Sequence, residues 1–146
     1  MDHKTLDGAL AEYFAPWVQE LGLRAEAFDA DSVTLRLPQS DRLSRVGGML
    51  CGQAMMAAAD TAMVLALINQ SGAFRPCTTV QMNTSFLKPL SGQDALVQAR
   101  VVRAGKSLAF GEIDIRGADD GKSVCRRARP TRCCEGWRRG REPTLR

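Results

Sequence analysis

The chain has 146 residues, 45% of them hydrophobic and 25% charged, a composition typical of one globular domain with one core. Its net charge of +4 comes entirely from the end of the chain. Residues 1–120 carry 11 basic and 14 acidic side chains, a balance of −3, whereas residues 121–146 carry 9 basic and 2 acidic ones, a balance of +7. The first 120 residues therefore give no electrostatic reason to expect nucleic-acid binding.

The cysteine and histidine content argues against two common kinds of site. The five cysteines form no Cys-x-x-Cys pair and the single histidine is His3, so we expect neither a zinc site nor a Ser-His-Asp or Cys-His catalytic device. We expect no cofactor. The odd cysteine count and an N-terminus without an apolar h-region favour a reducing, cytoplasmic location. The longest nearly apolar run, residues 54–68, is interrupted by Asp60 and is short for a membrane span.

The first third of the chain predicts an amphipathic helix and two short strands, at residues 4–20, 23–28 and 32–37. Pro16 should kink or split the helix, and Gly22 is a natural stop for it. The second strand alternates apolar and polar side chains, which is typical of a half-buried strand.

The middle of the chain predicts a polar loop over residues 39–48 and then one long helix, from about Met49 to Asn69. This helix is apolar almost all round, so we expect it to be buried on most sides. The remaining chain predicts antiparallel strands at residues 77–87, 94–103, 107–116 and from Lys122 onward, with tight turns at Ala104-Gly105 and Asp120-Gly121. A single apolar helix needs a curved sheet around it, so the expected architecture is α+β.

Three segments resemble one known family. Residues 51–62, CGQAMMAAADTA, resemble the central-helix signature of hotdog-fold thioesterases of the phenylacetate-degradation type, in the 4-hydroxybenzoyl-CoA thioesterase superfamily. Residues 79–89, TVQMNTSFLKP, resemble the family's next strand with its proline turn, and residues 105–110, GKSLAF, resemble a later hairpin. The resemblance implies a hotdog fold, an antiparallel sheet wrapped around the long helix, and hydrolysis of an acyl-CoA by a homodimer or a dimer of dimers.

The same resemblance assigns roles to individual residues. Asp60 falls on the catalytic carboxylate, Gly52 on the glycine whose N–H polarises the thioester carbonyl, and Gln53 on the family's second glycine. Thr79 falls where some members place a Ser or Thr that positions water. The chain departs from the family at two positions: Cys51 replaces a histidine, and Arg45 replaces an asparagine found in some members. Both departures affect the placement of the substrate.

The chemistry of these residue types points the same way. Asp60 is the only charged residue between Arg45 and Arg75, and a carboxylate on an apolar helix is costly unless it is used or paired. It could activate water or attack directly to form a mixed anhydride. Gly52 at the helix N-terminus could admit a carbonyl to the free N–H groups. Eight positions separate the two residues, about 12 Å along a helix, so if both act they must come from different chains.

Each assignment has a plainer alternative. Asp60 could cap a loop or pair with an arginine, Gly52 could serve close packing, and Thr79 could be an ordinary strand residue. Gln53 could be a polar group of the site or a hydrogen-bonding group at the helix end. Cys51 near a helix N-terminus could be nucleophilic but has no histidine partner, so a small buried residue is the simpler interpretation.

The substrate-binding candidates are of two kinds. Met56 could line an acyl pocket because methionine adapts to varied shapes, or it could be an ordinary core residue. Arg45 and Lys106 are candidates for contacts with substrate, and Lys106 could meet CoA phosphates. The alternative for such isolated surface charges is simple solvation. For the whole chain, the main alternative function is a non-catalytic acyl-CoA-binding hotdog domain; a dehydratase would need a histidine beside its carboxylate.

The last residues break the pattern of the rest. From Cys125 the sequence is rich in Arg, Pro, Cys, Trp and Gly and has almost no strand pattern, whereas the family continues a strand there. We therefore expect one domain over residues 1–124 and an atypical basic tail over residues 125–146, either a natural tail or the product of a frameshift near codon 124.

Overall fold

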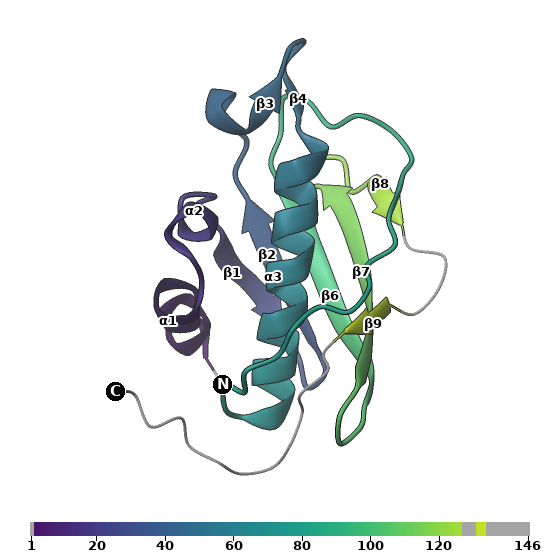
Figure 1. Cartoon of the computed structure of the whole chain (residues 1–146). Helices are drawn as coiled ribbons and strands as arrows, with labels where there is room; N and C mark the ends of the chain where they lie inside the picture. Colours follow the sequence, from purple (N-terminus) through teal and green to yellow (C-terminus); the bar gives the residue numbers. More distant parts are fainter. Residues whose placement is uncertain (1, 127–130, 134–146) are drawn as a thin grey trace.

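A computed structural model describes residues 2–126 and 131–133 of the chain. One long helix, α3 (Gly52–Ser71), lies across one face of a twisted antiparallel sheet (Figure 1). The strand order in that sheet is β1-β2-β6-β7-β8-β5, with β9 paired to β7. The strands are β1 (Arg24–Phe28), β2 (Ser32–Leu37), β5 (Ser85–Phe86), β6 (Ala95–Ala104), β7 (Ala109–Gly117), β8 (Ser123–Arg126) and β9 (Thr131–Cys133).

Small side chains allow α3 to pack closely on the sheet. Its sheet-facing residues Ala58, Ala62 and Ala66 are fully buried, and the helix contacts β2, β6 and β7. The helix ends at Gly72, whose φ of 74° lets the amide N–H return to the carbonyl of Ile68 at 2.8 Å. One core therefore lies between α3 and the concave face of the sheet.

The start of α3 differs from the prediction. The helix begins at Gly52 rather than Met49, because Met49–Leu50 forms strand β4, which pairs with β3 (Ser44–Arg45). The turn between them uses Gly47 and Gly48, with φ of 93° and 71°. The predicted loop is thus partly a hairpin, preceded by the 3-10 turn η1 (Asp41–Leu43).

The N-terminal helix is split at Pro16, as predicted, into α1 (His3–Tyr13) and α2 (Pro16–Gln19). The Gln19 side chain bridges the break by donating to the carbonyls of Ala11 and Phe14, at 3.0 and 2.7 Å. β2 also differs from its prediction, because Ser32 and Thr34 are buried along with its apolar residues; the strand lies inside the sheet, between β1 and β6.

The strand predicted at residues 77–87 is mostly wrong. Only β5 is regular, and it pairs with β8 through Ser85 with Arg126 and Phe86 with Cys125. Thr79 forms an isolated β-bridge, and residues 77–78 and 80–84 have no regular secondary structure. The predicted strands β6, β7 and β8 and the turn at Gly105 are confirmed.

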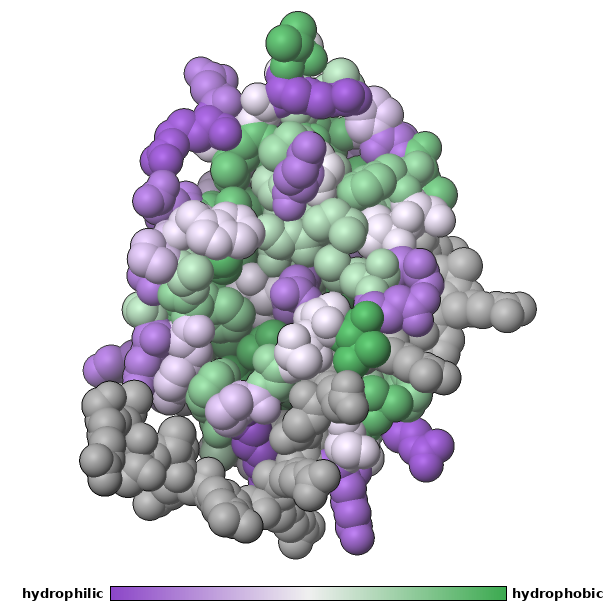
Figure 2. Space-filling view, in the orientation of Figure 1, coloured by the Kyte–Doolittle hydropathy of each residue, from purple (hydrophilic) through white to green (hydrophobic). Residues whose placement is uncertain are grey.

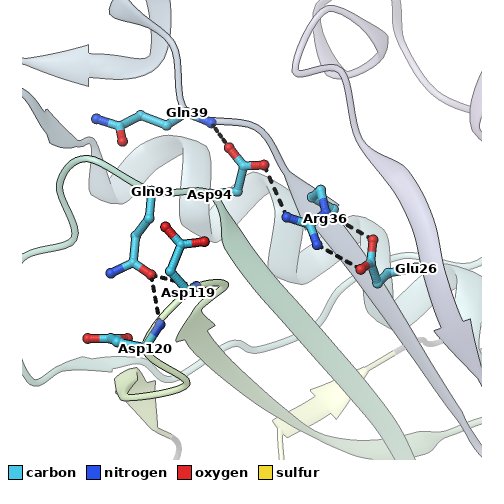
Figure 3. A network of polar contacts seen from close by, with 7 residues as sticks. All are labelled: Glu26, Arg36, Gln39, Gln93, Asp94, Asp119 and Asp120. Atoms are coloured by element: carbon cyan, nitrogen blue, oxygen red, sulfur yellow. Dashed lines mark hydrogen bonds and ion pairs between the residues drawn. The ribbon is translucent and has the colours of Figure 1, made fainter.

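A polar network fixes one end of the sheet (Figure 3). The Arg36 guanidinium lies 2.7 Å from Glu26 and 3.2 Å from Asp94, which joins β1, β2 and the start of β6. Beside it, the Gln93 side-chain oxygen accepts from the backbone N–H of Asp119 at 2.9 Å. The Arg36 guanidinium holds the pKa of the Glu26 carboxyl below its usual range. These contacts stabilise the turns at this end of the sheet.

Most of the predicted basic tail, residues 127–130 and 134–146, lies outside the described residues. Within residues 2–126 and 131–133, no helix is long and apolar enough to cross a membrane.

Candidate active site

An open hollow runs along the side of α3 that the sheet leaves uncovered. Its volume is about 930 Å³. Figure 2 shows this face, where apolar side chains gather over α3. The lining residues come from α2, α3, the irregular segment before β5, and β5 itself: Trp17, Gly52, Gln53, Met56, Ala57, Asp60, Thr79, Met82, Asn83, Thr84 and Phe86.

Asp60 supplies the one carboxylate of this hollow. Its Oδ1 accepts a hydrogen bond from the Thr79 hydroxyl at 2.5 Å. Asp60 is half-buried. Most of α3 is buried, as predicted, and the stripe that carries Met56, Ala57 and Asp60 is only partly covered. Because Thr79 hydrogen-bonds one carboxylate oxygen, the Asp60 carboxylate is held in a fixed position on the wall of the hollow.

Gly52 begins α3 and lies directly under an aromatic ring. A Cβ built on Gly52 would be 3.3 Å from Cζ of Phe86, so the glycine allows close packing, the alternative noted above. Cys51 is the half-buried N-cap residue, and its side chain makes no capping hydrogen bond. The Cys51 side chain therefore leaves the N–H groups of the first turn uncapped, and Gln53 in this turn is exposed.

Gly52 and Asp60 line the same hollow but do not converge. They are two helical turns apart, about 12 Å along α3. A thioester carbon in contact with one of them cannot contact the other within the same chain. Within one chain the two candidate groups of the hollow, the helix N-terminus at Gly52 and the Asp60 carboxylate, therefore lie too far apart to act on the same atom.

A second hollow, of about 610 Å³, opens at the N-terminus of α3. Arg45 and Lys88 line it together with Gly52 and Gln53. The Arg45 guanidinium lies 3.8 Å from the Met49 sulfur, and the Lys88 ammonium lies 3.8 Å from the Asp120 carboxylate. Two cations beside a helix N-terminus make this hollow attractive to anions.

The structure brings together most of the predicted site residues, but Cys51 and Lys106 line neither hollow. Asp60, Gly52, Gln53, Thr79 and Met56 share the first hollow, and Arg45 joins the second. Lys106 lies in the turn between β6 and β7, which Figure 1 places at the other end of the molecule from the β3–β4 hairpin. Within one chain Lys106 is therefore not part of either hollow.

Sequence reasoning missed several apolar residues of the hollow. Trp17 is 61% exposed and Phe86 48% exposed, and both line it with Met82. In the sequence these residues look like core residues. Trp17 fits the apolar stripe of a helix, and Phe86 and Met82 fit the alternation of a strand. Nothing in spacing alone distinguishes such residues from core residues.

A sheet wrapped around one long helix, with a carboxylate on the open side of that helix, is the hotdog arrangement. Residues 47–124 match the family model described as the Thioesterase superfamily, and the chain belongs to this family. The matched region ends at Val124, the residue after which the sequence predicts an atypical basic tail. The predicted fold and the predicted enzyme class, a thioester hydrolase, are confirmed.

Individual relatives agree with the family. An esterase of Pseudomonas aeruginosa, PA1618, is 30% identical over 107 residues, covering 72% of each chain. The crystal structure of a mutant of thioesterase PA1618 has a TM-score of 0.76 at 26% identity, covering 92% of this chain and 95% of that one. A phenylacetic acid degradation-related protein from Ralstonia eutropha has a TM-score of 0.70 at 25% identity, covering 89% and 98%.

Proposed function

We propose that the chain is an acyl-CoA thioesterase of the phenylacetate-degradation type, with Asp60 as its catalytic carboxylate. The observation that carries this proposal is the Asp60–Thr79 pair, a carboxylate held at 2.5 Å by a hydroxyl on the wall of an apolar hollow. Either Asp60 takes a proton from water that attacks the thioester carbon, or it attacks that carbon itself. In both routes the C–S bond breaks and CoA leaves as a thiolate that takes up a proton. In the second route water then hydrolyses the mixed anhydride, which releases the carboxylic acid and restores the Asp60 carboxylate. The acyl group is aromatic or fatty.

The complete site is formed by two copies of the chain. The open stripe of α3, with Met56, Ala57 and Val64 half-buried, and the exposed Trp17 beside it form an apolar face suited to a second copy. Two such helices placed side by side in opposite directions would bring Asp60 of one copy toward Gly52 of the other. The carbonyl oxygen would then meet the N–H groups of one helix while the carboxylate of the other meets water. Such a dimer could pair again into a dimer of dimers.

The CoA end of the substrate has its own place in this proposal. Arg45 and Lys88, with the N–H groups of the first turn of α3 that Cys51 leaves uncapped, would bind the phosphates in the second hollow. Entry from that side requires the Phe86 ring to move off Gly52, and Phe86 is exposed enough to rotate. A contact of Lys106 with CoA remains a prediction, as does the cytoplasmic location.

Complementation between two inactive variants tests the two-chain site. Asp60→Asn removes the carboxylate, and Gly52→Val blocks the N–H side with a branched side chain. Each homodimer lacks both sites. If the two chains are unfolded together and refolded as a mixture, half of the dimers carry one intact site, so we expect about a quarter of the parent activity.

A matched control uses both substitutions on one chain. In an equal mixture of the double variant Gly52→Val, Asp60→Asn with the parent chain, each of the two sites of a hybrid dimer receives one defect. Only the parent homodimers, a quarter of all dimers, stay active, so we expect about a quarter of the parent activity. A site contained within one chain would instead leave about half. No recovery of activity from the two single variants, with dimers present by light scattering, would contradict a site shared between chains.

A further inference from the structure

Two aromatic rings stack outside the core and join the N-terminal helices to the segment that follows α3. The rings of Tyr13, the last residue of α1, and Phe74 are 4.1 Å apart between centroids and inclined by 8°. Tyr13 is 41% exposed and Phe74 is 37% exposed, so the pair lies at the surface rather than in the core. The stack is therefore a specific contact between two segments that are far apart in the sequence.

The α1 side of this stack is held by its own contacts. The Gln19 side chain donates to the carbonyls of Ala11 and Phe14, which lie on either side of Tyr13 in the sequence. The next helix, α2, is anchored by the buried Val18. The corner between α1 and α2 is therefore a fixed base for the Tyr13 ring.

The other side of the stack leads to the candidate carboxylate. Figure 1 shows the chain turning back after α3 and crossing over that helix, where Thr79 hydrogen-bonds Asp60. Only residues 75–78 separate Phe74 from Thr79. Pro76 lies in this link, and a proline fixes its own φ and restricts the preceding residue to extended conformations. The link is therefore short and stiff, and a displacement of Phe74 is passed on to Thr79.

Thr79 depends on such an anchor because the chain around it is irregular. It forms only an isolated β-bridge, and the regular strand β5 begins later, at Ser85. The Thr79 hydroxyl nevertheless lies 2.5 Å from Oδ1 of Asp60, and a hydrogen bond weakens steeply when its geometry is disturbed. The Tyr13–Phe74 stack supplies an anchor on the N-terminal side of Thr79.

We infer that Tyr13 is a positioning residue of the proposed reaction. Its stack with Phe74 holds the segment that carries Thr79, and Thr79 in turn holds the Asp60 carboxylate. Tyr13 does not line the hollow and acts only through these contacts. The effect on turnover rests on the proposed function, whereas the effect on the order of the segment does not.

Kinetics of single and double variants of the full chain test this role. Tyr13→Leu removes the ring, and we expect kcat for acyl-CoA hydrolysis to fall about two- to tenfold, the factor that one stacked pair contributes, with KM unchanged. Tyr13→Phe keeps the ring and should have the parent kcat. In a Thr79→Val background, Tyr13→Leu should have no further effect on kcat, because it acts through Thr79.

His3→Leu is the matched control on the same helix. The His3 ring also makes an aromatic contact from α1, with Phe28 at 5.1 Å between centroids, but this contact joins α1 to β1 rather than to the segment after α3. His3→Leu should lower Tm slightly and leave kcat unchanged. Thermal unfolding checks that each variant folds.

Hydrogen exchange measures the same anchor without any turnover. In Tyr13→Leu, the amides of residues 77–84 should exchange about two- to tenfold faster than in the parent, while those of β6 and β7 keep their rates. In Tyr13→Phe and His3→Leu, residues 77–84 should exchange as in the parent.

Four results would overturn the inference: unchanged exchange of residues 77–84 in Tyr13→Leu, an unchanged kcat of this variant, additive effects of Tyr13→Leu and Thr79→Val on kcat, or an equal loss of kcat in His3→Leu. The proposed function fails separately. If the parent hydrolyses no acyl-CoA, the thioesterase proposal is removed, and hydrogen exchange alone decides whether the stack holds the segment.

Discussion

Replacing Asp60 by Asn separates a catalytic from a structural carboxylate. Asn keeps an oxygen that can accept from Thr79, so the 2.5 Å hydrogen bond changes only from a charged to a neutral acceptor. For this half-buried pair the loss of stability should be below about 1 kcal/mol, which lowers Tm by less than about 4 °C in a chain of this size. Turnover should fall about 10²- to 10⁴-fold, which corresponds to about 3–5 kcal/mol in the activation free energy.

The assay pairs thermal unfolding with release of CoA thiol from acyl-CoA, and adds binding of a thioether analogue to check the affinity. Asp7→Asn is the matched control, because the Asp7 carboxylate also accepts one hydrogen bond, from the Ala25 N–H at 3.0 Å, but lies away from the hollow. It should leave turnover unchanged. If Asp60→Asn instead lowers Tm strongly and leaves kcat per folded molecule intact, the carboxylate is structural and the mechanism is refuted.

Two further outcomes follow from the hydrogen bonds. Thr79→Val should lower kcat about tenfold with little change in KM, because it frees the carboxylate that Thr79 positions, while Thr79→Ser should restore kcat; a change confined to KM would contradict the positioning role. Glu26→Gln should cost about 0.5 kcal/mol of unfolding free energy at pH 7, since its pair with Arg36 is partly exposed. The pKa of Glu26 is lowered from 4.5 in the folded chain, mainly by its hydrogen bond with Arg36. This stabilisation is therefore present above pH 4.5 and is lost as the pH falls through the lowered pKa. Urea unfolding should find that the difference between the parent and Glu26→Gln shrinks as the pH is lowered below 4.5.

The elements best predicted from sequence were those whose cause is local. Pro16 splits the first helix, and Gly105 turns β6 into β7, because backbone constraints at proline and glycine act within a few residues. The strand expected at residues 77–87 was mostly wrong because a strand depends on its partner. Its alternation is present in the sequence, but only Ser85 and Phe86 form a regular strand, paired with Arg126 and Cys125, and Thr79 forms an isolated β-bridge.

In the candidate site, too, some features could be predicted from the sequence and others depend on contacts between distant residues. The family resemblance placed Asp60, Gly52 and Thr79, and these do line one hollow. It could not predict that Phe86 stands over Gly52, since that contact joins residues 34 positions apart in the sequence. Nor could the helix pattern show that Asp60 lies on an open face. An all-apolar helix has no polar face to mark the side that the sheet leaves uncovered.

That open face connects the stability of the helix with its chemistry. The alanines of α3 bury one side against the sheet, and the other side keeps Met56, Ala57 and Val64 only half-covered. Leaving apolar surface in water is unfavourable by about 25 cal/mol per Å², so association through this face gains free energy before any substrate binds. Because Asp60 lies in the same stripe, the association that buries it would also exclude water around the carboxylate and strengthen its electrostatic interactions there. A substitution that adds charge at Val64 would therefore weaken assembly and catalysis together, although Val64 touches neither hollow.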